Sequence, residues 1–367
     1  MIVIAADTHK SSHSFSAVAE QTGRVEGEKT FGADERGMVR TLRWAKGLGD
    51  ERVWALEDCR HVSGRLERFL VASGERVIRV APKLMGQSRR AERQAGKSDV
   101  IDARAIARAV LKDGIDTFAM AFLDERAMEI RLLADHRADL VAERTRMQSR
   151  LRWHLVELDD ALEATIPPGA LDRRVWLERV DRRLRRLAQT ARVRVARDEL
   201  RRIRELTRTA AELERELEAL IAAHRPELLA WRGCGVLSAA TLIGRTAGAA
   251  RFATDGHFAR QAGAAPIPAS SGRKDRQRLN RGGDRQLNAA LHRIAVAQGR
   301  CHPPAAAFLA RKQAEGKSRI EALRCLKRHL ARHAWQLLRA PHPVQENSLS
   351  MTNANNANAP AHALALT

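Results

Sequence analysis

Five strand-like runs in the first eighty residues, with acids at the ends of the first and the fourth, most constrain how this chain can fold. The apolar residues 2–6 lead directly into Asp7, and residues 52–56 lead into Glu57. Turn-forming residues 22–23 favour an antiparallel meander of the first three runs. The expected order is strands at 2–6, 14–20 and 25–31, a helix capped by Asp34, a strand at 52–57, a helix near 62–70 and a strand at 77–80.

This order of strands and helices is that of the ribonuclease-H-like nucleases, an analogy at the level of the fold. In that topology the first and fourth strands end at the same edge of the sheet, so Asp7 and Glu57 are expected to lie close together. Asp58 competes with Glu57 for this place, because neighbouring residues of a strand point to opposite faces. The sequence leaves open which of the two faces inward.

Two more acids begin a predicted helix further along the chain. Ser98 is a good N-cap, and Asp99 and Asp102 then share one face of the first helical turn. Acids in a first turn also complement the helix dipole without any catalytic role. Both interpretations of this pair are open.

Together, Asp7, Glu57, Asp99 and Asp102 form a set of oxygen ligands in a chain whose formal net charge is +21. Such hard ligands suit Mg²⁺ or Mn²⁺. Two such ions about 4 Å apart stabilise the attacking and leaving oxygens of a phosphodiester. The charge itself indicates a polyanionic partner.

Several residue types and segments that the sequence lacks exclude classes of function. The chain has no tyrosine, which excludes a recombinase that attacks DNA with a tyrosine hydroxyl. Its four cysteines are scattered without a C-x-x-C pair, which argues against a zinc ribbon or a disulfide framework. No run of eighteen apolar residues or signal peptide is found, so no membrane association and a cytoplasmic, nucleoid-associated location are expected.

Residues 124–228 are expected to form a helical coiled-coil spacer, broken at the Pro-Pro-Gly of residues 167–169. Its later part carries apolar residues at alternating steps of three and four: Ile203, Leu206, Ala210, Leu213, Leu217 and Leu220. Self-association through a coiled coil or an antiparallel hairpin within the chain would each bury this seam. The arginine-rich run 173–204 is either a solvated face or a phosphate-binding surface.

Residues 229–340 are expected to form a mostly helical C-terminal domain, followed by a disordered tail at 341–367. Gly233-Cys234-Gly235 resembles the hairpin of helix-hairpin-helix modules. A proline- and glycine-rich loop beginning at Gly263 carries two hydroxyls, Ser270 and Ser271. The loop also carries cations able to bind phosphate, which are Arg273, Lys274, Arg276, Arg278, Arg281 and Arg285. Basic helices are expected at 286–298 and 315–338.

These motifs together resemble transposases of the insertion-sequence 110 family, described as bridge-RNA-guided recombinases. The matching residues are Asp7-Thr8-His9-Lys10, Leu56-Glu57, Lys97-Ser98-Asp99 with Asp102-Ala103, Ala265-Pro266 with Ser270-Ser271-Gly272, and Arg281-Gly282-Gly283-Asp284-Arg285. They span nearly the whole chain. The resemblance implies an α/β RuvC-like domain at 1–115 and two largely helical parts after it.

The resemblance also implies a mechanism. Asp7, Glu57, Asp99 and Asp102 become metal ligands, and Ser271, the serine directly before Gly272, becomes the nucleophile. The doubled serine leaves Ser270 as a second candidate. Donor and target DNA, a structured guide RNA and a dimer or tetramer of this chain become the expected partners. A composite site would join the acids of one subunit to the serine of another.

Two alternatives stay open at this point. In the first, the four acids hydrolyse DNA junctions as a metal-dependent nuclease and the serine is structural. In the second, the protein binds nucleic acid without catalysis, and the acids serve as caps and turns.

Overall fold

The computed structural model describes residues 1–57, 60–80, 98–118, 120–121, 124–268, 277–278, 280 and 282–340. The packing divides the chain into two compact units. The first contains Met1–Glu125, Ala247–Asn288 and Lys327–Arg339, and the second contains Arg126–Thr246 and Ala289–Leu326. The domain boundaries expected from the sequence stay predictions.

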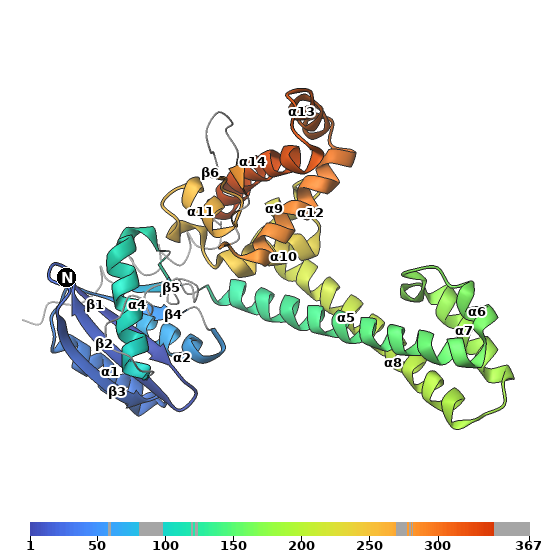
Figure 1. Cartoon of the computed structure of the whole chain (residues 1–367), viewed down its shortest axis with the longest axis horizontal. Helices are drawn as coiled ribbons and strands as arrows, with labels where there is room; N and C mark the ends of the chain where they lie inside the picture. The colour runs from blue at the N-terminus through green and yellow to red at the C-terminus, as the bar shows by residue number, and fades with distance from the viewer. Residues whose placement is uncertain are drawn as a thin grey trace, which may run out of the picture. The chain divides into compact units, whose positions relative to one another are not determined.

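A five-stranded sheet forms the N-terminal part of the first unit (Figure 1). The strands lie in the order β3-β2-β1-β4-β5. β2 is antiparallel to β1 and β3, whereas β4 runs parallel to β1 and β5 parallel to β4. This is the predicted meander followed by parallel strands. Their bounds are β1 Ile2–Thr8, β2 Ser12–Ala19, β3 Val25–Gly32, β4 Arg52–Glu57 and β5 Val77–Val80.

Helices cover both faces of this sheet. The core between the sheet and α4 (Asp99–Asp113) contains Val3 and Ala5, whereas the core on the opposite face contains Ile4 and Ala6. The second core is closed by α1 (Glu35–Lys46) and α2 (Arg60–Ala72). Odd-numbered residues of β1 therefore point toward α4, which places Asp7 on that side.

The start of α1 requires glycine at position 37. The Asp34 carboxylate accepts a hydrogen bond of 2.9 Å from the Gly37 backbone N–H, as the predicted cap. A Cβ on Gly37 would come 1.9 Å from the Gly32 carbonyl oxygen. The chain can make this close turn from β3 into α1 only without a side chain there.

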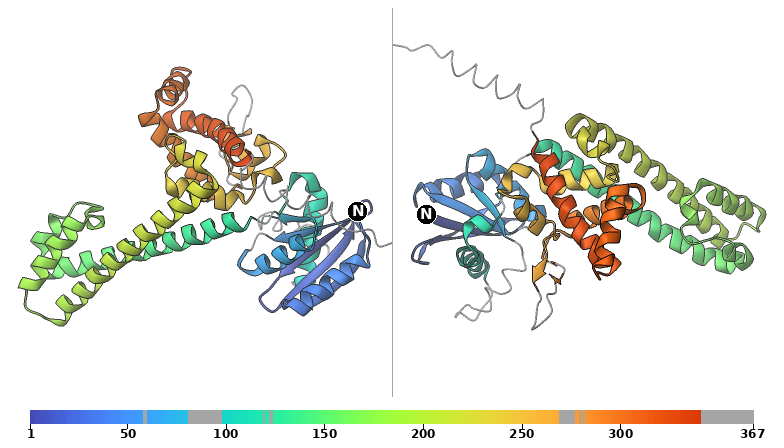
Figure 2. Two further views of the ribbon diagram at one scale, coloured as in Figure 1. Left: turned by 180° about the vertical axis from the view of Figure 1, so that it is seen from behind. Right: turned by 90° about the horizontal axis from the view of Figure 1, so that it is seen from above.

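Two long helices of the second unit, α5 (Glu125–Leu158) and α8 (Ala191–His224), form an antiparallel hairpin (Figures 1 and 2). Arg137 of α5 donates to the Ala210 carbonyl and pairs with Glu214 at 2.6 Å. Nearer the far end of the hairpin, Arg202 of α8 donates to Glu143 at 2.9 Å. The two helices are antiparallel, because the earlier residue of α5 pairs with the later residues of α8.

The apolar seam of α8 is therefore covered within the chain. Ile203, Leu206, Ala210 and Leu217 are buried, while Leu213 and Leu220 are half-buried. The structure thus favours the intramolecular hairpin, and self-association through a coiled coil stays a prediction. The helix break predicted at residues 167–169 is confirmed. Gly169 has φ +72° and lies between α6 (Asp160–Ala164) and α7 (Arg174–Arg186).

The C-terminal part is mostly helical, as expected, and the described residues add a short strand pair, β6 and β7, that the sequence did not predict. One expected helix, at 315–338, is wrong at its start. Gly316 (φ +87°) follows α13, and Ser318 and Glu321 form a reciprocal capping box that begins α14. The elements are α9 Pro226–Ala230, α10 Val236–Thr246, α11 Asp255–Gln261, β6 Ile267–Pro268, β7 Gln277–Arg278, α12 Arg285–Cys301, α13 Pro303–Ala314 and α14 Arg319–Arg339. In the described part of the chain, short 3-10 turns lie at Ile115–Thr117, Ala170–Asp172 and Ala249–Arg251.

Among the described residues, no helix is long and apolar enough to cross a membrane. The tail at 341–367, expected to be disordered, lies outside the described residues.

Candidate functional site

The ends of β1 and β4 carry two of the predicted acids on the same side of the sheet. The parallel register pairs Ala6 with Leu56, so Asp7 and Glu57 are the next residues of the two strands. Val53 and Ala55 belong to the core on the α4 side, and alternation therefore turns Glu57 toward that side as well. This geometry favours Glu57 for the inward place; Asp58 lies outside the described residues.

The other two acids begin α4, which packs against β1. The Ser98 hydroxyl, and neither acid, is the side-chain cap of the helix, because its oxygen accepts from the Ile101 N–H at 3.3 Å. Asp99 is exposed, whereas Asp102 is 6% exposed. The positive end of the helix dipole favours both carboxylates in this place.

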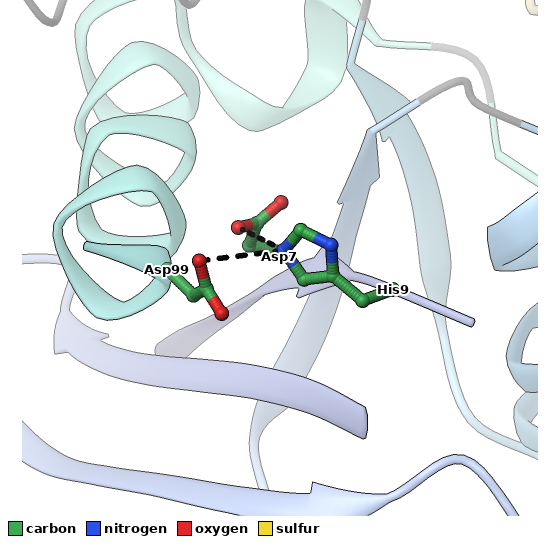
Figure 3. A group of neighbouring side chains, drawn as sticks. All are labelled: Asp7, His9 and Asp99. Carbon is green, nitrogen blue, oxygen red and sulfur yellow. Dashed lines mark hydrogen bonds and ion pairs between the residues drawn. The ribbon is translucent and has the colours of Figure 1, made fainter. Parts of the chain in front are cut away.

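A cluster of three side chains forms where β1 meets the start of α4 (Figure 3). His9 Nε2 lies 3.1 Å from an Asp7 carboxylate oxygen and 3.4 Å from an Asp99 carboxylate oxygen. One ligand atom from each of the three residues lies within 4.8 Å of the others. The three side chains converge on one point, as ligands of a single ion would.

Burial makes the Asp7 carboxylate costly to ionise. Desolvation raises the pKa of Asp7 above its ordinary value, and the nearby charges of Asp102 and Asp99 raise it further. The attraction and hydrogen bond of His9 act in the opposite direction but do not cancel the effect. Asp7 is only 7% exposed. A carboxylate buried beside two other acids is better satisfied by a cation than by water.

The donor set fits a divalent cation. Carboxylate oxygens suit Mg²⁺ and Mn²⁺, while the imidazole nitrogen of His9 adds a donor that Mn²⁺ accepts more readily than Mg²⁺ does. His9 was not predicted as a site residue from the sequence. The available signal was its place in the Asp7–Lys10 motif, two residues after the strand-ending acid.

The serine loop is described only at its ends. β6 and β7 pair on either side of it, with Ile267 opposite Arg278 and Pro268 opposite Gln277. The predicted nucleophiles and most of the predicted phosphate-binding cations lie outside the described residues, namely Ser270, Ser271, Arg273, Lys274, Arg276 and Arg281. Arg278 and Arg285 are described, and both are exposed.

The chain segments before and after the loop pack closely against each other. A Cβ on Gly283 would come 2.3 Å from the Gly263 backbone nitrogen, so this close approach requires glycine at 283, while Gly263 has a φ of +61° that also favours glycine. Asn288 donates to the Gly263 carbonyl at 2.8 Å and accepts from the buried Lys327 ammonium, also at 2.8 Å. Asp284 caps α12 by accepting from the Leu287 N–H. These contacts give Gly283 and Asp284 of the Arg281–Arg285 motif a structural role at the base of the loop.

The structure thus brings Asp7, Asp99 and Asp102 together and turns Glu57 toward the same side. It does not describe the two serines. The roles of all these residues stay predictions.

Comparison with known families gives two matches along the chain. Residues 4–158 match the IS110 DEDD model, described as "Transposase". Residues 226–310 match a second model, described as "Transposase IS116/IS110/IS902 family". The first match contains the acid cluster, and the second contains the serine loop.

Relatives from insertion elements match across most of their length. The 42 kDa protein of insertion element IS900 from Mycobacterium paratuberculosis is 25% identical, over 91% of this chain and 94% of the relative. The 43.6 kDa protein of IS110 from Streptomyces coelicolor is 29% identical, over 66% and 71%. The 44.8 kDa protein of IS116 from Streptomyces clavuligerus is 26% identical, over 86% and 90%. A solved structure, T. thermophilus RuvC in complex with a Holliday junction substrate, is 15% identical and covers 33% of this chain and 99% of its own, with a TM-score of 0.27.

Proposed function

This chain belongs to the IS110 family of transposases, and we propose that it cuts and rejoins donor and target DNA with a divalent-metal site and a serine nucleophile. Membership makes it a DNA transposase or recombinase. The metal ligands in the proposal are Asp7, Glu57, Asp99 and Asp102, with His9 as an additional donor. The nucleophile is Ser271, with Ser270 as the second candidate.

The observation that carries the metal part is the buried Asp7 carboxylate. Its pKa is raised by desolvation and by the charges of Asp102 and Asp99, while Asp99 and His9 converge on it. Acids that served only as caps or turns would have no reason to converge on one point, and the side-chain cap of α4 is Ser98. This arrangement argues against a binding protein without catalysis.

The carboxylates would hold the ion at the edge of the sheet where β1, β4 and α4 meet. A bound Mg²⁺ or Mn²⁺ supplies charge neutralisation at the attacked phosphate. The burial of Asp7 keeps water from competing for that carboxylate. The exposed position of Asp99 leaves the site open to a DNA strand.

The covalent step is an exchange of one phosphodiester for another. The Ser271 Oγ forms a bond to phosphorus while the bond from phosphorus to a deoxyribose oxygen breaks. The proton of the serine hydroxyl ends on the departing deoxyribose oxygen, so charge and atoms balance. A deoxyribose hydroxyl of the other DNA then attacks the phosphorus and breaks its bond to the Ser271 Oγ. The proton of that hydroxyl ends on the serine oxygen, and the two strands are joined. Cations near the serine, with Arg278 and Arg285 among them, would offset the charge that develops on the phosphate.

Ser271→Ala tests the serine step directly. We expect a covalent protein–DNA adduct on a denaturing gel with the wild type and with Ser270→Ala, and none with Ser271→Ala, which should still bind DNA. Metal-dependent nicking without an adduct in any variant would instead support the junction-resolving nuclease. An adduct in Ser271→Ala that disappears in Ser270→Ala would move the nucleophile by one residue.

The partners of the proposal rest on the family resemblance. A structured RNA would pair with both DNAs and supply the sequence specificity, and withholding that RNA should abolish site-specific exchange. A dimer or tetramer would join the acids of one subunit to the serine of another. Mixing Asp7→Asn with Ser271→Ala subunits should then restore activity, whereas a site within one subunit would leave the mixture inactive.

A further inference from the structure

Helix α7 carries a large excess of arginine. It lies in the segment that connects α5 to α8 at one end of the hairpin. Its thirteen residues contain six arginines and two acids. Both acids are already neutralised within the unit. Glu178 pairs with Arg174 at 2.5 Å, and the buried Asp181 pairs with Arg185 at 2.9 Å and with Arg204 at 3.2 Å. Arg183 pairs with Asp159 outside the helix. The positive charge that remains is that of Arg179, Arg182 and Arg186, for which α7 has no further acid.

Three of the six arginines lie in a line that we call the α7 stripe, formed by Arg179, Arg182 and Arg186. At 3.6 residues per turn, their spacing of three and four places them within an arc of about 60°. The opposite side of the helix is the buried one, with Leu177 and Leu184 in the core. All three arginines are exposed. The stripe is thus the outermost surface of α7.

The stripe arginines have no ion pair with any residue that the structure describes. Arg182 exerts only a weaker attraction on Glu178, whose low pKa is due chiefly to its bond with Arg174. Like charges at these spacings repel one another along a helix. Arg186, in the last turn, is favoured by the helix dipole, but Arg179 and Arg182 are too far from the C-terminus to gain from it.

One stripe residue is also held in place. The Arg179 guanidinium stacks over the half-buried Trp176 ring, 5.0 Å from its centre. Stacking on an aromatic ring limits the motion of a guanidinium without neutralising its charge. The guanidinium occupies one face of the ring, so that face is not available as a platform for unpaired bases.

From these contacts we propose that the α7 stripe is a docking surface for the sugar–phosphate backbone of duplex DNA. The three guanidinium groups extend over about 10 Å along the helix axis. Phosphates of one strand follow each other by about 3.4 Å along a B-form duplex, so this length matches about three of them. Exposed arginines without acidic partners fit a contact with phosphates that is independent of sequence. This surface lies in the second unit and does not depend on the acid cluster or on either serine.

The test is the salt dependence of DNA binding, measured in EDTA so that no strand is cut. Fluorescence anisotropy would follow a 30-base-pair duplex of arbitrary sequence between 50 and 200 mM salt. The stripe variant carries Arg179→Gln, Arg182→Gln and Arg186→Gln. The control variant loses the same charge at exposed arginines that already have acidic partners, through Arg174→Gln, Arg192→Gln and Arg201→Gln.

We expect the slope of log K against log salt to fall by about 2.7 in the stripe variant, since each phosphate contact contributes about 0.9. Over the fourfold range of salt, the wild type should then lose about 40-fold more affinity than the stripe variant. The control variant should keep most of the wild-type slope, and Arg→Lys at all three stripe positions should restore it. If the triple variant fails to fold, each single Arg→Gln change should lower the slope by about 0.9.

Three results would overturn the proposal. The stripe variant could keep the wild-type slope. The stripe and control variants could lose slope equally, which would reflect net charge alone. The loss could also appear only with an RNA duplex of the same length, which would assign the surface to RNA. Because binding is measured without catalysis, a failure here is distinct from a failure of the serine and metal proposal.

Discussion

Replacing Asp7 by asparagine should stabilise the metal-free protein and remove its response to divalent cations. Asparagine keeps the shape of the side chain and can still bond to His9, so the change is mainly the loss of one buried charge. That charge lies among acids: a carboxylate oxygen of Asp99 is within 4.8 Å, and the Asp102 charge also raises the pKa of Asp7. Ionised Asp7 therefore costs stability when no cation is present.

The size of this cost follows from the geometry. Two unit charges 4.8 Å apart repel by about 0.9 kcal/mol in bulk water and about 3.5 kcal/mol at an effective dielectric constant of 20. The Asp99 side chain is 56% exposed, so the lower end applies and we take about 1 kcal/mol. For the unfolding of a domain of about 150–250 residues, a stabilisation of about 1 kcal/mol raises the Tm by roughly 2–4 °C.

A bound cation should make the wild type more stable than Asp7→Asn. At a concentration one hundred times its Kd, a ligand that binds only the folded state adds about 2.7 kcal/mol. The wild type should gain this amount and Asp7→Asn much less of it, so the wild type becomes the more stable protein by between about 1 and 2 kcal/mol.

The pH dependence has a definite sign. Because burial raises the folded-state pKa of Asp7, the stability from its protonated form is fully present below the ordinary value of 3.8 and is lost as pH rises through the raised pKa. The advantage of Asp7→Asn in the metal-free protein should therefore appear at neutral pH and vanish on acidification below that ordinary value.

Differential scanning calorimetry at several pH values, with EDTA or with Mn²⁺, measures all of these quantities. Asp50→Asn is the matched control, because Asp50 is exposed in the turn before β4 and loses the same charge. The reasoning fails if Mn²⁺ stabilises Asp7→Asn as much as the wild type. It also fails if Asp7→Asn lowers the Tm of the metal-free protein while Asp50→Asn does not.

Two further outcomes are expected. His9→Ala should weaken Mn²⁺ binding more than Mg²⁺ binding, because it removes the nitrogen donor beside Asp7 and Asp99; titration calorimetry would show equal losses if His9 only positioned the carboxylates. Burial raises the pKa of the Cys234 thiol to about 12, so iodoacetamide at pH 8 should leave it unmodified while the exposed Cys301 reacts. Alkylation of both at similar rates, detected by mass spectrometry of the folded protein, would contradict this.

The strand order and the acids at the strand ends followed from local pattern. An apolar run with an acid after it marks a buried strand and its end, and this pattern placed Asp7 and Glu57 correctly at the ends of β1 and β4. The cap at Ser98 was also readable, since a hydroxyl before a helix accepts from the first turn whatever surrounds it. Helix α13 was missed, although the prolines at residues 303 and 304 are a signal for a helix start.

The sequence by itself indicated the apolar face of elements such as α8, because periodicity is a property of neighbours along the chain, although Leu213 and Leu220 of that seam are only half-buried. It determined the seam of α8 but not its partner; only the tertiary structure decided that α5 of the same chain covers Ile203 and Leu206. It determined that one of Glu57 and Asp58 faces inward, and the register of β4 beside β1 favours Glu57. It placed His9 in the Asp7–Lys10 motif, but only the tertiary structure showed that this side chain turns back to meet Asp7 and Asp99. These choices depend on contacts between residues far apart in the chain, and such contacts arise only when the sheet and its helices pack together.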